Sequence, residues 1–558
     1  MSYNNLNEAI ARLDEIEAAS AAYSHAMGAL SLDAATAAPL GAADGRGKTM
    51  AVLSKVVYDL AASAESRELM EYLTEHADEL DPEHRRQVEI RKKDCEQITR
   101  IPQEEYIAFN VLLNKAEGIW RVAKQENDFA SFAPVLEEIV AYNRKFAGYY
   151  DAKKLPYDAL LNEYEEGLTM ETLDAFFAEL RKVIVPLVKA ISEKEQPDTA
   201  FLDQSYPIEQ QKVLAKYLMD TIGLDPNRCT ITESEHPFTM GFNTSDVRIT
   251  THYHEFNPTF SFFSTIHEGG HALYDLGVNP DYDGTCLGGG ASMGIHESQS
   301  RFYENLIGRS LEFIELIFPR MQELFPQQLA NVTAYDLYRA VNKAEPSLIR
   351  TESDELTYAL HIMVRYEVEK QLMDGTLAVK DVPAEWNRLY KEYLGIDVPS
   401  DTLGCLQDSH WSGGSIGYFP SYALGSAYGA QMKHVMEADI GPIAGYVAKG
   451  DIAPITAWLG EHIHRFGNMK KPAAIFEDAC GKFDAKYFAD YLTEKYSRIY
   501  GLKPIIHFHV IASPARGVAI PSGSATDFGD CHVGLWPPRN DVFFLRALKS
   551  LATWENLW

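Results

Sequence analysis

The sequence has few cysteines, no long apolar run and no excess of positive charge. Its six cysteines are spread over 558 residues without a C-x-x-C pair, which predicts reduced thiols in a cytoplasm rather than a disulfide framework. No stretch of about 18 apolar residues occurs, so we expect no transmembrane helix, and the polar start predicts no secretory signal. The formal net charge of −29 disfavours binding to nucleic acid or to an anionic membrane.

What the sequence does contain is an H-E-x-x-H pattern, formed by His267, Glu268 and His271. Residues four apart on a helix lie on one face, about 6 Å from each other, so both imidazoles can reach one metal ion. The pattern is typical of zinc peptidases, in which the glutamate is the general base. Apolar residues on both sides predict a helix buried beside a cleft. The alternative is a satisfied histidine pair on the surface of an ordinary helix.

A catalytic zinc site needs a third protein ligand and one open position. A glycine-rich loop is expected after the metal helix, and a second helix behind it would return that ligand. Either His296 or Glu297 can serve; we favour Glu297, which gives a set of two histidines and one carboxylate. Asp275 follows His271 by four residues and is a candidate acceptor for the N–H group of a ligand.

Hydrophobic periodicity predicts a mostly helical protein with a minor β element. β-Branched and aromatic residues gather at 229–262, which predicts a small sheet or hairpin just before the metal helix. Residues 1–502 are expected to form one large domain. Residues 503–558 differ in charge and tryptophan content, and we expect an atypical extension that is non-native or poorly ordered. The expected helices span 5–30, 46–77, 82–97, 103–126, 133–149, 169–194, 292–318, 334–343, 353–375, 383–394, 420–437, 442–449, 452–462 and 482–498.

Six short motifs occur in the order found in one enzyme family. They are His236-Pro237-Phe238, D-x-R-x-T at 246–250, H-E-x-x-H at 267–271, His296 to Gln299, Ile349 to Asp354, and G-x-x-Q-D-x-H-W at 404–411. With these motifs the chain resembles the carboxypeptidase Taq family of metallocarboxypeptidases, over roughly residues 6–502. Ser353 departs from the family's I-R-x-x-A-D motif, which has alanine there.

The resemblance implies a mostly helical fold similar to neurolysin and angiotensin-converting enzyme, with a deep groove over the metal. It implies a carboxypeptidase domain over residues 1–502 that releases single C-terminal residues from peptides with broad specificity. It also implies zinc, with cobalt acceptable, and a homodimer. Carried over by position, His267, His271 and Glu297 would be the metal ligands, and Glu268 the catalytic acid and base.

An exopeptidase also needs a cation for the free carboxylate of its substrate and a donor for the oxyanion. We expect Arg350 to bind the carboxylate. A structural ion pair of Arg350 with Glu352 or Asp354 is the alternative, and Arg248 is a competing cation. The candidates for contacts with the oxyanion or the substrate backbone are His236, His410, Tyr418 and Tyr422. For each of these four residues, the alternative is a packing role in which its polar atoms are satisfied within the protein.

Two other functions remain open at this point. A metallo-endopeptidase or dipeptide-releasing enzyme of the same fold group would keep Glu268 but would not need Arg350 as a carboxylate clamp. A non-catalytic protein that binds metal and peptide would not need Glu268 at all.

Overall fold

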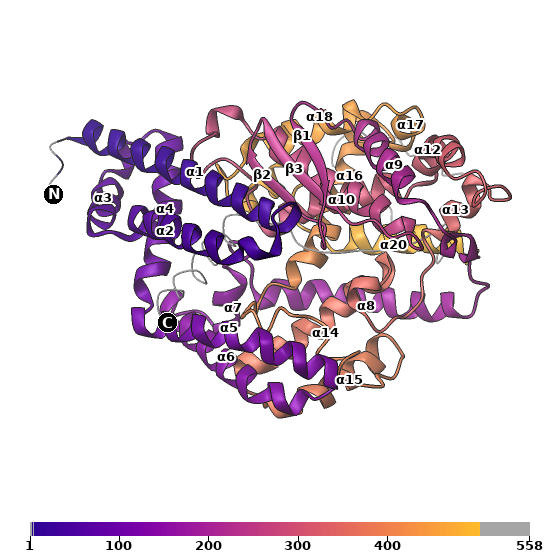
Figure 1. The fold of residues 1–558 in the computed structure, drawn as a ribbon, viewed down its shortest axis with the longest axis horizontal. Coiled ribbons are helices and arrows are strands. Elements are labelled where there is room, and N and C mark those ends of the chain that lie inside the picture. The colour runs from indigo at the N-terminus through magenta and orange to yellow at the C-terminus, as the bar shows by residue number, and fades with distance from the viewer. Residues whose placement is uncertain (1–2, 4, 503–558) are drawn as a thin grey trace, which may run out of the picture.

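Helices dominate the structure, a computed structural model that describes residue 3 and residues 5–502 (Figure 1). The predicted mostly helical fold with a minor β element is confirmed. The predicted extension, 503–558, lies outside the described residues. Within the described part, no helix has both the length and the apolar character that crossing a bilayer requires. The described cysteines form no disulfide with one another.

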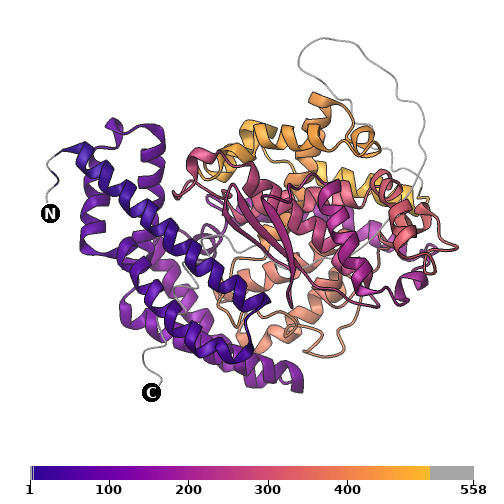
Figure 2. The same ribbon diagram turned by 45° about the horizontal axis from the view of Figure 1, so that its top comes forward.

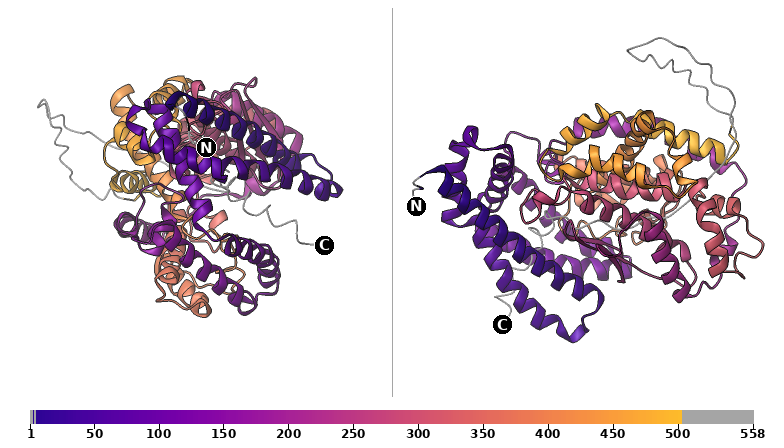
Figure 3. Two further views of the ribbon diagram at one scale, coloured as in Figure 1. Left: turned by 90° about the vertical axis from the view of Figure 1, so that its left-hand side faces the viewer. Right: turned by 90° about the horizontal axis from the view of Figure 1, so that it is seen from above.

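The N-terminal helices form a unit with a small core of its own, which stands to one side of the main body (Figures 2 and 3). They are α1 (Leu6–Thr36), α2 (Ala43–Ala62), α3 (Ala64–Glu75) and α4 (Pro82–Arg100). The single helix expected over 46–77 is wrong, because Ser63 is extended and separates α2 from α3. The Ser63 hydroxyl accepts the N–H of Ser66 at 3.1 Å and so caps the second helix.

Further helices enclose the main apolar core. The helix α8 (Met170–Ser192) buries the predicted stripe that includes Leu173, Phe176 and Leu180. Helices α7, α9 and α19 are additions to the predicted set. The other helices of the body are α5 (Gln103–Glu126), α6 (Phe129–Tyr150), α7 (Pro156–Leu161), α9 (Ile208–Thr221), α13 (Ala334–Ala340), α14 (Glu355–Asp374), α15 (Val382–Tyr393), α17 (Ala444–Val447), α18 (Ala453–His462), α19 (Pro472–Cys480) and α20 (Lys486–Ile499).

A three-stranded sheet packs against helix α10 (Pro258–Gly277). Its order is β1 (Cys229–Glu233), β3 (Asp246–Thr251), β2 (Thr239–Asn243). The predicted small sheet is present, but the two segments that predicted it, β1 and β3, pair in parallel and form no hairpin. The hairpin is formed by β2 and β3, which pair antiparallel. Val247 and Ile249 of β3 are fully buried in the main core. The sheet is thereby held on α10, and its edge strand β2 begins beside that helix.

Glycines let helices α10, α11 (Met293–Arg301) and α16 (Pro420–Ile440) approach closely. A Cβ atom on Gly270 would lie 2.6 Å from the carbonyl oxygen of Gln299. A Cβ atom on Gly425 would lie 2.6 Å from Cβ of Glu297. Glycine weakens an isolated helix by about 1 kcal/mol relative to alanine, so here it is the tight helix packing that requires it.

The single helix expected over 292–318 is also wrong. After α11 the chain continues as a π-helical segment, η5 (Phe302–Gly308), and restarts as α12 (Leu311–Leu324). Ser310 starts α12 by accepting the N–H of Phe313 at 3.1 Å. A π-helical turn holds an extra residue and often lies at a functional site. Here it packs against α10 and changes which side chains after residue 301 face that helix.

Candidate active site

Two imidazoles and one carboxylate meet between α10 and α11. Nε2 of His267 and Nε2 of His271 lie 3.7 Å and 3.6 Å from Oε2 of Glu297. Neither Nε2 atom has a hydrogen-bond partner among the described residues, although both are buried. Ligand atoms around a tetrahedral ion with bonds of about 2.1 Å are about 3.4 Å apart. Over residues 5–502 this is the one group of histidine, cysteine and acidic side chains that can hold a metal, and it fits a divalent ion.

His296, the alternative third ligand, has both ring nitrogens engaged elsewhere. Its Nδ1 lies 3.0 Å from Nδ1 of His271, and its Nε2 lies 3.1 Å from Oδ1 of Asp275. Asp275 therefore contacts His296, and not a ligand N–H group directly as the sequence suggested. If Nε2 of His271 is to offer its lone pair to a metal, Nδ1–H must donate to His296, which in turn donates to Asp275. This chain fixes the tautomer of His271.

A second buried carboxylate, Glu304 on η5, orients His267. Its Oε2 lies 2.9 Å from Nδ1 of His267. Arg301 and Arg309 donate to the same carboxylate at 3.2 Å and 2.6 Å, and Arg301 also donates to Glu297 at 2.8 Å. Burial alone would raise the pKa of Glu304, but the two guanidinium groups and His267 hold it well below its ordinary value. Sequence reasoning missed Glu304; the available signal was an acidic residue inside an apolar run.

Glu268 is fully buried, with one carboxylate oxygen bonded and one unpartnered. Oε2 accepts a hydrogen bond of 2.6 Å from the hydroxyl of Thr239, the first residue of β2. Oε1 has no partner among the described residues. Burial raises the pKa of Glu268 to about 7. A carboxyl group with this pKa can both take up and release a proton near neutrality. Thr239, which orients it, was not identified from the sequence.

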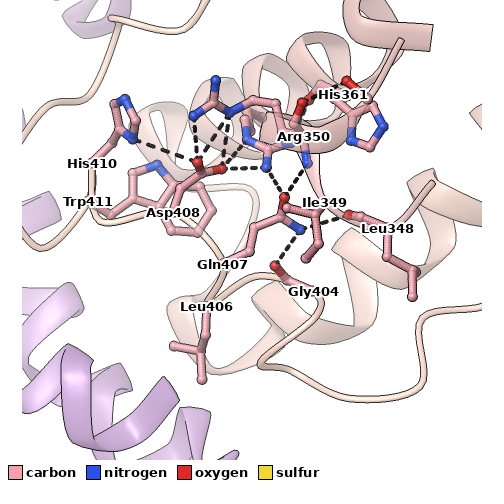
Figure 4. A network of polar contacts seen from close by, with 12 residues as sticks. Leu348, Ile349, Arg350, His361, Gly404, Leu406, Gln407, Asp408, His410 and Trp411 are labelled. Atoms are coloured by element: carbon pink, nitrogen blue, oxygen red, sulfur yellow. Dashed lines mark hydrogen bonds and ion pairs between the residues drawn. The ribbon is translucent and has the colours of Figure 1, made fainter. Parts of the chain in front are cut away.

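The predicted carboxylate clamp, Arg350, lies in a buried ion-pair network (Figure 4). Its Nε and Nη2 donate to Oδ1 of Asp408 at 3.1 Å and 2.7 Å. The alternative partners Glu352 and Asp354 do not pair with it in the described structure; Asp354 instead caps α14 by accepting the N–H of Thr357 at 2.7 Å. Arg350 therefore does form a buried ion pair, but with a residue 58 positions away in the chain and not with its sequence neighbours.

The arginine network connects to the candidate metal ligands through one tyrosine. Nη1 of Arg350 donates to the hydroxyl of Tyr358 at 3.1 Å. The guanidinium carbon of Arg301 lies 4.8 Å from the centre of the same ring, and Arg301 donates to Glu297. The two clusters therefore belong to one continuous buried site. The competing cation Arg248 is elsewhere, paired with Asp246 on strand β3.

The network carries more positive than negative charge. Arg365 donates from Nε to Oδ2 of Asp408 at 2.7 Å, so two guanidinium groups share one carboxylate. Burial lowers the pKa of His410, which lies beside Asp408, to about 3, so this imidazole is neutral. An unbalanced charge away from water is costly. The site therefore favours an additional anion next to Arg350.

Aromatic side chains from α16 and the segment before it complete this region. The Tyr422 hydroxyl lies 3.5 Å from Nε2 of His410, and its ring centre lies 5.2 Å from the guanidinium carbon of Arg350. The Tyr418 hydroxyl is buried and has no hydrogen-bond partner among the described residues. The structure thus brings Arg350, His410, Tyr418 and Tyr422 together. His236 is different: it is exposed, on the segment that leads into β2.

A cavity of about 590 Å³ lies next to this site. It is lined by α4 of the N-terminal unit, including Lys92 and Lys93, and by the loop 288–293. Its lining also includes Thr239 and His296, the side chains that contact Glu268 and His271. Open space is therefore available between the N-terminal unit and the residues behind the metal ligands.

Comparisons with known proteins agree with this geometry. The sequence profile of the carboxypeptidase Taq (M32) metallopeptidases matches residues 12–496. Carboxypeptidase 1 of Bacillus subtilis is 42% identical over 480 residues, which cover 86% of this chain and 96% of that protein. Thermostable carboxypeptidase 1 of Thermus thermophilus is 36% identical over 496 residues, which cover 86% and 97%.

The fold agrees as well. The crystal structure of an M32 carboxypeptidase from Deinococcus radiodurans superposes with a TM-score of 0.86 at 37% identity, covering 88% of this chain and 99% of that one. The predicted likeness to neurolysin and angiotensin-converting enzyme stays a prediction. The chain belongs to the carboxypeptidase Taq (M32) family of metallopeptidases, and the sequence-based prediction of a metal-dependent carboxypeptidase is confirmed.

Proposed function

We propose that this protein is a zinc carboxypeptidase that removes single C-terminal residues from peptides with broad specificity. One observation carries the proposal: a buried set of two imidazoles and one carboxylate is joined through Tyr358 to an arginine network with excess positive charge. Two imidazoles and a carboxylate suit zinc and leave a coordination position open. Cobalt prefers similar ligands and is expected to substitute.

His267, His271 and Glu297 would hold the metal, which would polarise the scissile carbonyl and acidify a water molecule. The unpartnered Oε1 of Glu268 would accept the proton of the attacking water and then deliver it to the leaving amine. Its pKa of about 7 suits both steps. Thr239 holds the other oxygen, so that the carboxyl group cannot rotate away.

Arg350 would bind the free carboxylate of the substrate. It has five N–H donors, and its bonds to Asp408 and Tyr358 involve only some of them. The buried Tyr418 hydroxyl would donate to the oxyanion or to the substrate backbone. We assign His410 and His236 to contacts with the substrate on the strength of the family motifs. We assign Tyr422 the same role because its hydroxyl lies 3.5 Å from Nε2 of His410.

A metallo-endopeptidase is the second candidate, since Arg350 is already paired with Asp408. A C-terminal amide separates the two functions. A carboxypeptidase should release residues one at a time from a free peptide and should leave the amidated peptide intact, as mass spectrometry of a timed digest would show. Internal cuts in both peptides would support the endopeptidase.

The substitution Glu268→Gln tests the mechanism. We expect bound zinc to remain stoichiometric by metal analysis, while kcat falls by roughly a hundredfold or more because the proton acceptor is lost. The matched control is Glu165→Gln, since burial also raises the pKa of Glu165 to about 7, but its carboxyl group lies outside the metal site. Undiminished turnover by Glu268→Gln would refute the proposed role of Glu268. Hydrolysis of peptide by the native protein would by itself exclude the non-catalytic metal and peptide binder.

The remaining proposals concern assembly and location. The family resemblance supports a homodimer, which light scattering of the purified protein would test. The cysteines are dispersed, and those that the structure describes form no disulfide with one another. This supports a cytoplasmic location, which fractionation of the source cells would test. Because the protein is strongly acidic, we propose that its partners are peptides and that it binds neither nucleic acid nor membrane.

A further inference from the structure

We propose that Arg365 and Asp408 are positioning residues that hold the guanidinium group of Arg350 ready for the C-terminal carboxylate of a peptide. The proposal rests on the function proposed above, and specifically on Arg350 as the carboxylate-binding residue. In the sequence, Asp408 stood out only as the aspartate of the G-x-x-Q-D-x-H-W motif, with no role assigned, and Arg365 was not identified. Both act through Arg350 and need no contact with the substrate.

Arg365 is fixed on all sides. Its side chain is fully buried, at 0% exposure. Nη1 donates to the carbonyl oxygen of His361 at 2.8 Å, and Nη2 donates to Oε1 of Gln407 at 2.7 Å. The guanidinium carbon lies 4.7 Å from the centre of the Trp386 ring. These contacts fix the orientation of the Arg365 guanidinium group. The group that accepts its remaining hydrogen bonds is therefore also held in a fixed position.

What it holds is Asp408, which lies beside Arg350 (Figure 4). Each oxygen of Asp408 makes its shortest hydrogen bonds with a different arginine. Oδ2 accepts from Nε of Arg365 at 2.7 Å, and Oδ1 accepts from Nη2 of Arg350 at 2.7 Å. Gln407 reinforces the arrangement, because the Oε1 atom that binds Arg365 also accepts the backbone N–H of Arg350 at 2.8 Å. The orientation of Arg350 therefore follows from the fixed position of Arg365.

The arrangement also leaves part of the hydrogen-bonding capacity of Arg350 available, although Nη1 donates one N–H group to the hydroxyl of Tyr358. Asp408 is bound by Nε and Nη2, on one edge of the guanidinium plane. Each terminal nitrogen carries two N–H groups, so the edge formed by Nη1 and Nη2 retains donors for a second carboxylate. Arg365 meanwhile balances the charge of Asp408, so that the charge of Arg350 is left for the substrate. Position and charge thus favour the same ligand.

Two substitutions separate positioning from charge. Asp408→Asn removes a negative charge and makes the network more positive, so charge alone would lower KM. Arg365→Lys keeps the charge and removes the planar fork. If position decides, both variants should raise KM for a free-carboxylate peptide by roughly tenfold and change kcat much less, because ground-state and transition-state binding weaken together. Their preference for the free peptide over its amide should fall by the same factor.

The matched control is Arg91→Lys, because Arg91 also binds one buried carboxylate, Glu17, through Nε and Nη2, on a helix far from Arg350 in the chain. It should keep the KM of the native holoenzyme. Circular dichroism checks that each variant is folded. If one of Asp408→Asn and Arg365→Lys fails to fold, the other is sufficient to test the positioning role.

The outcomes distinguish this inference from the proposed function. If the native enzyme cleaves the amidated peptide as well as the free one, the function proposed for Arg350 is wrong. If the native enzyme discriminates and Arg350→Gln does not, the function holds. In that case, an unchanged KM in Arg365→Lys, or a lower KM in Asp408→Asn, would overturn the positioning role.

Discussion

Glu165 provides a test of how burial controls ionisation in this protein. It lies after α7, with 3% of its surface exposed, and its Oε2 accepts the N–H of Gly294 at 3.0 Å. Its Oε1 has no hydrogen-bond partner among the described residues. Burial raises its pKa from an ordinary 4.5 to about 7. The folded protein therefore binds this proton more tightly than the unfolded chain does.

The sign and size of the effect follow from this difference. Stability from the protonated carboxyl group is fully present below pH 4.5 and is lost as the pH rises towards about 7. At about 1.4 kcal/mol per pKa unit, the loss between these values is about 3 kcal/mol. Glutamine has a similar shape and no ionisation, so Glu165→Gln should escape the loss.

Urea unfolding of both proteins at pH 5 and pH 8 measures the prediction. The difference in unfolding free energy, variant minus native, should rise by about 2–3 kcal/mol between the two values. The metal site is the same in both proteins, so its own pH dependence cancels. Glu137→Gln, at an exposed position of α6, is the control for the change of charge. Equal pH dependence of the native protein and Glu165→Gln would show that the carboxyl group is already ionised in the folded protein.

Two further predictions concern the supports of the metal site. Gly270→Ala should destabilise the protein by roughly 1–3 kcal/mol, because its Cβ would lie 2.6 Å from the backbone of Gln299. The control is Gly460→Ala, whose Cβ would meet nothing within 4 Å and which should not destabilise the protein. Thermal unfolding of both variants measures the difference. Glu304→Gln should weaken zinc binding by roughly 10–100-fold, since Glu304 orients His267, as competition with a chromophoric chelator would measure; unchanged affinity would contradict that role.

The grouping of the candidate metal ligands was predictable because their spacing is local. Four residues on a helix bring His267 and His271 to one face whatever the rest of the chain does. Placing Glu297 required only one loop and one more helix, and its Oε2 is found within 3.7 Å of both imidazoles. The periodic stripe of α8 was predictable for the same reason. Local geometry and one short connection were sufficient in each case.

Other parts depend on contacts that no local pattern encodes. The partner of Arg350 was sought among its neighbours in sequence, whereas Asp408 reaches it from another segment. One helix was expected over 292–318, and a π-helical turn inside it has no signature in the residue composition that would have shown the break. Glu304 faces His267 only because of that turn and the packing on α10. Such features follow from tertiary packing and not from periodicity.

The balance of charge explains why two buried clusters of similar composition would bind opposite ligands. Beside the imidazoles, Arg301 and Arg309 are matched by two carboxylates, Glu297 and Glu304. Nε2 of His267 and Nε2 of His271 have no hydrogen-bond partner among the described residues, and ring nitrogens placed in this way can bind a cation. In the arginine network, a single carboxylate serves two guanidinium groups, and the excess charge attracts an anion. A peptide whose C-terminal carboxylate occupies the second cluster would place its last peptide bond towards the first, because Tyr358 joins the two.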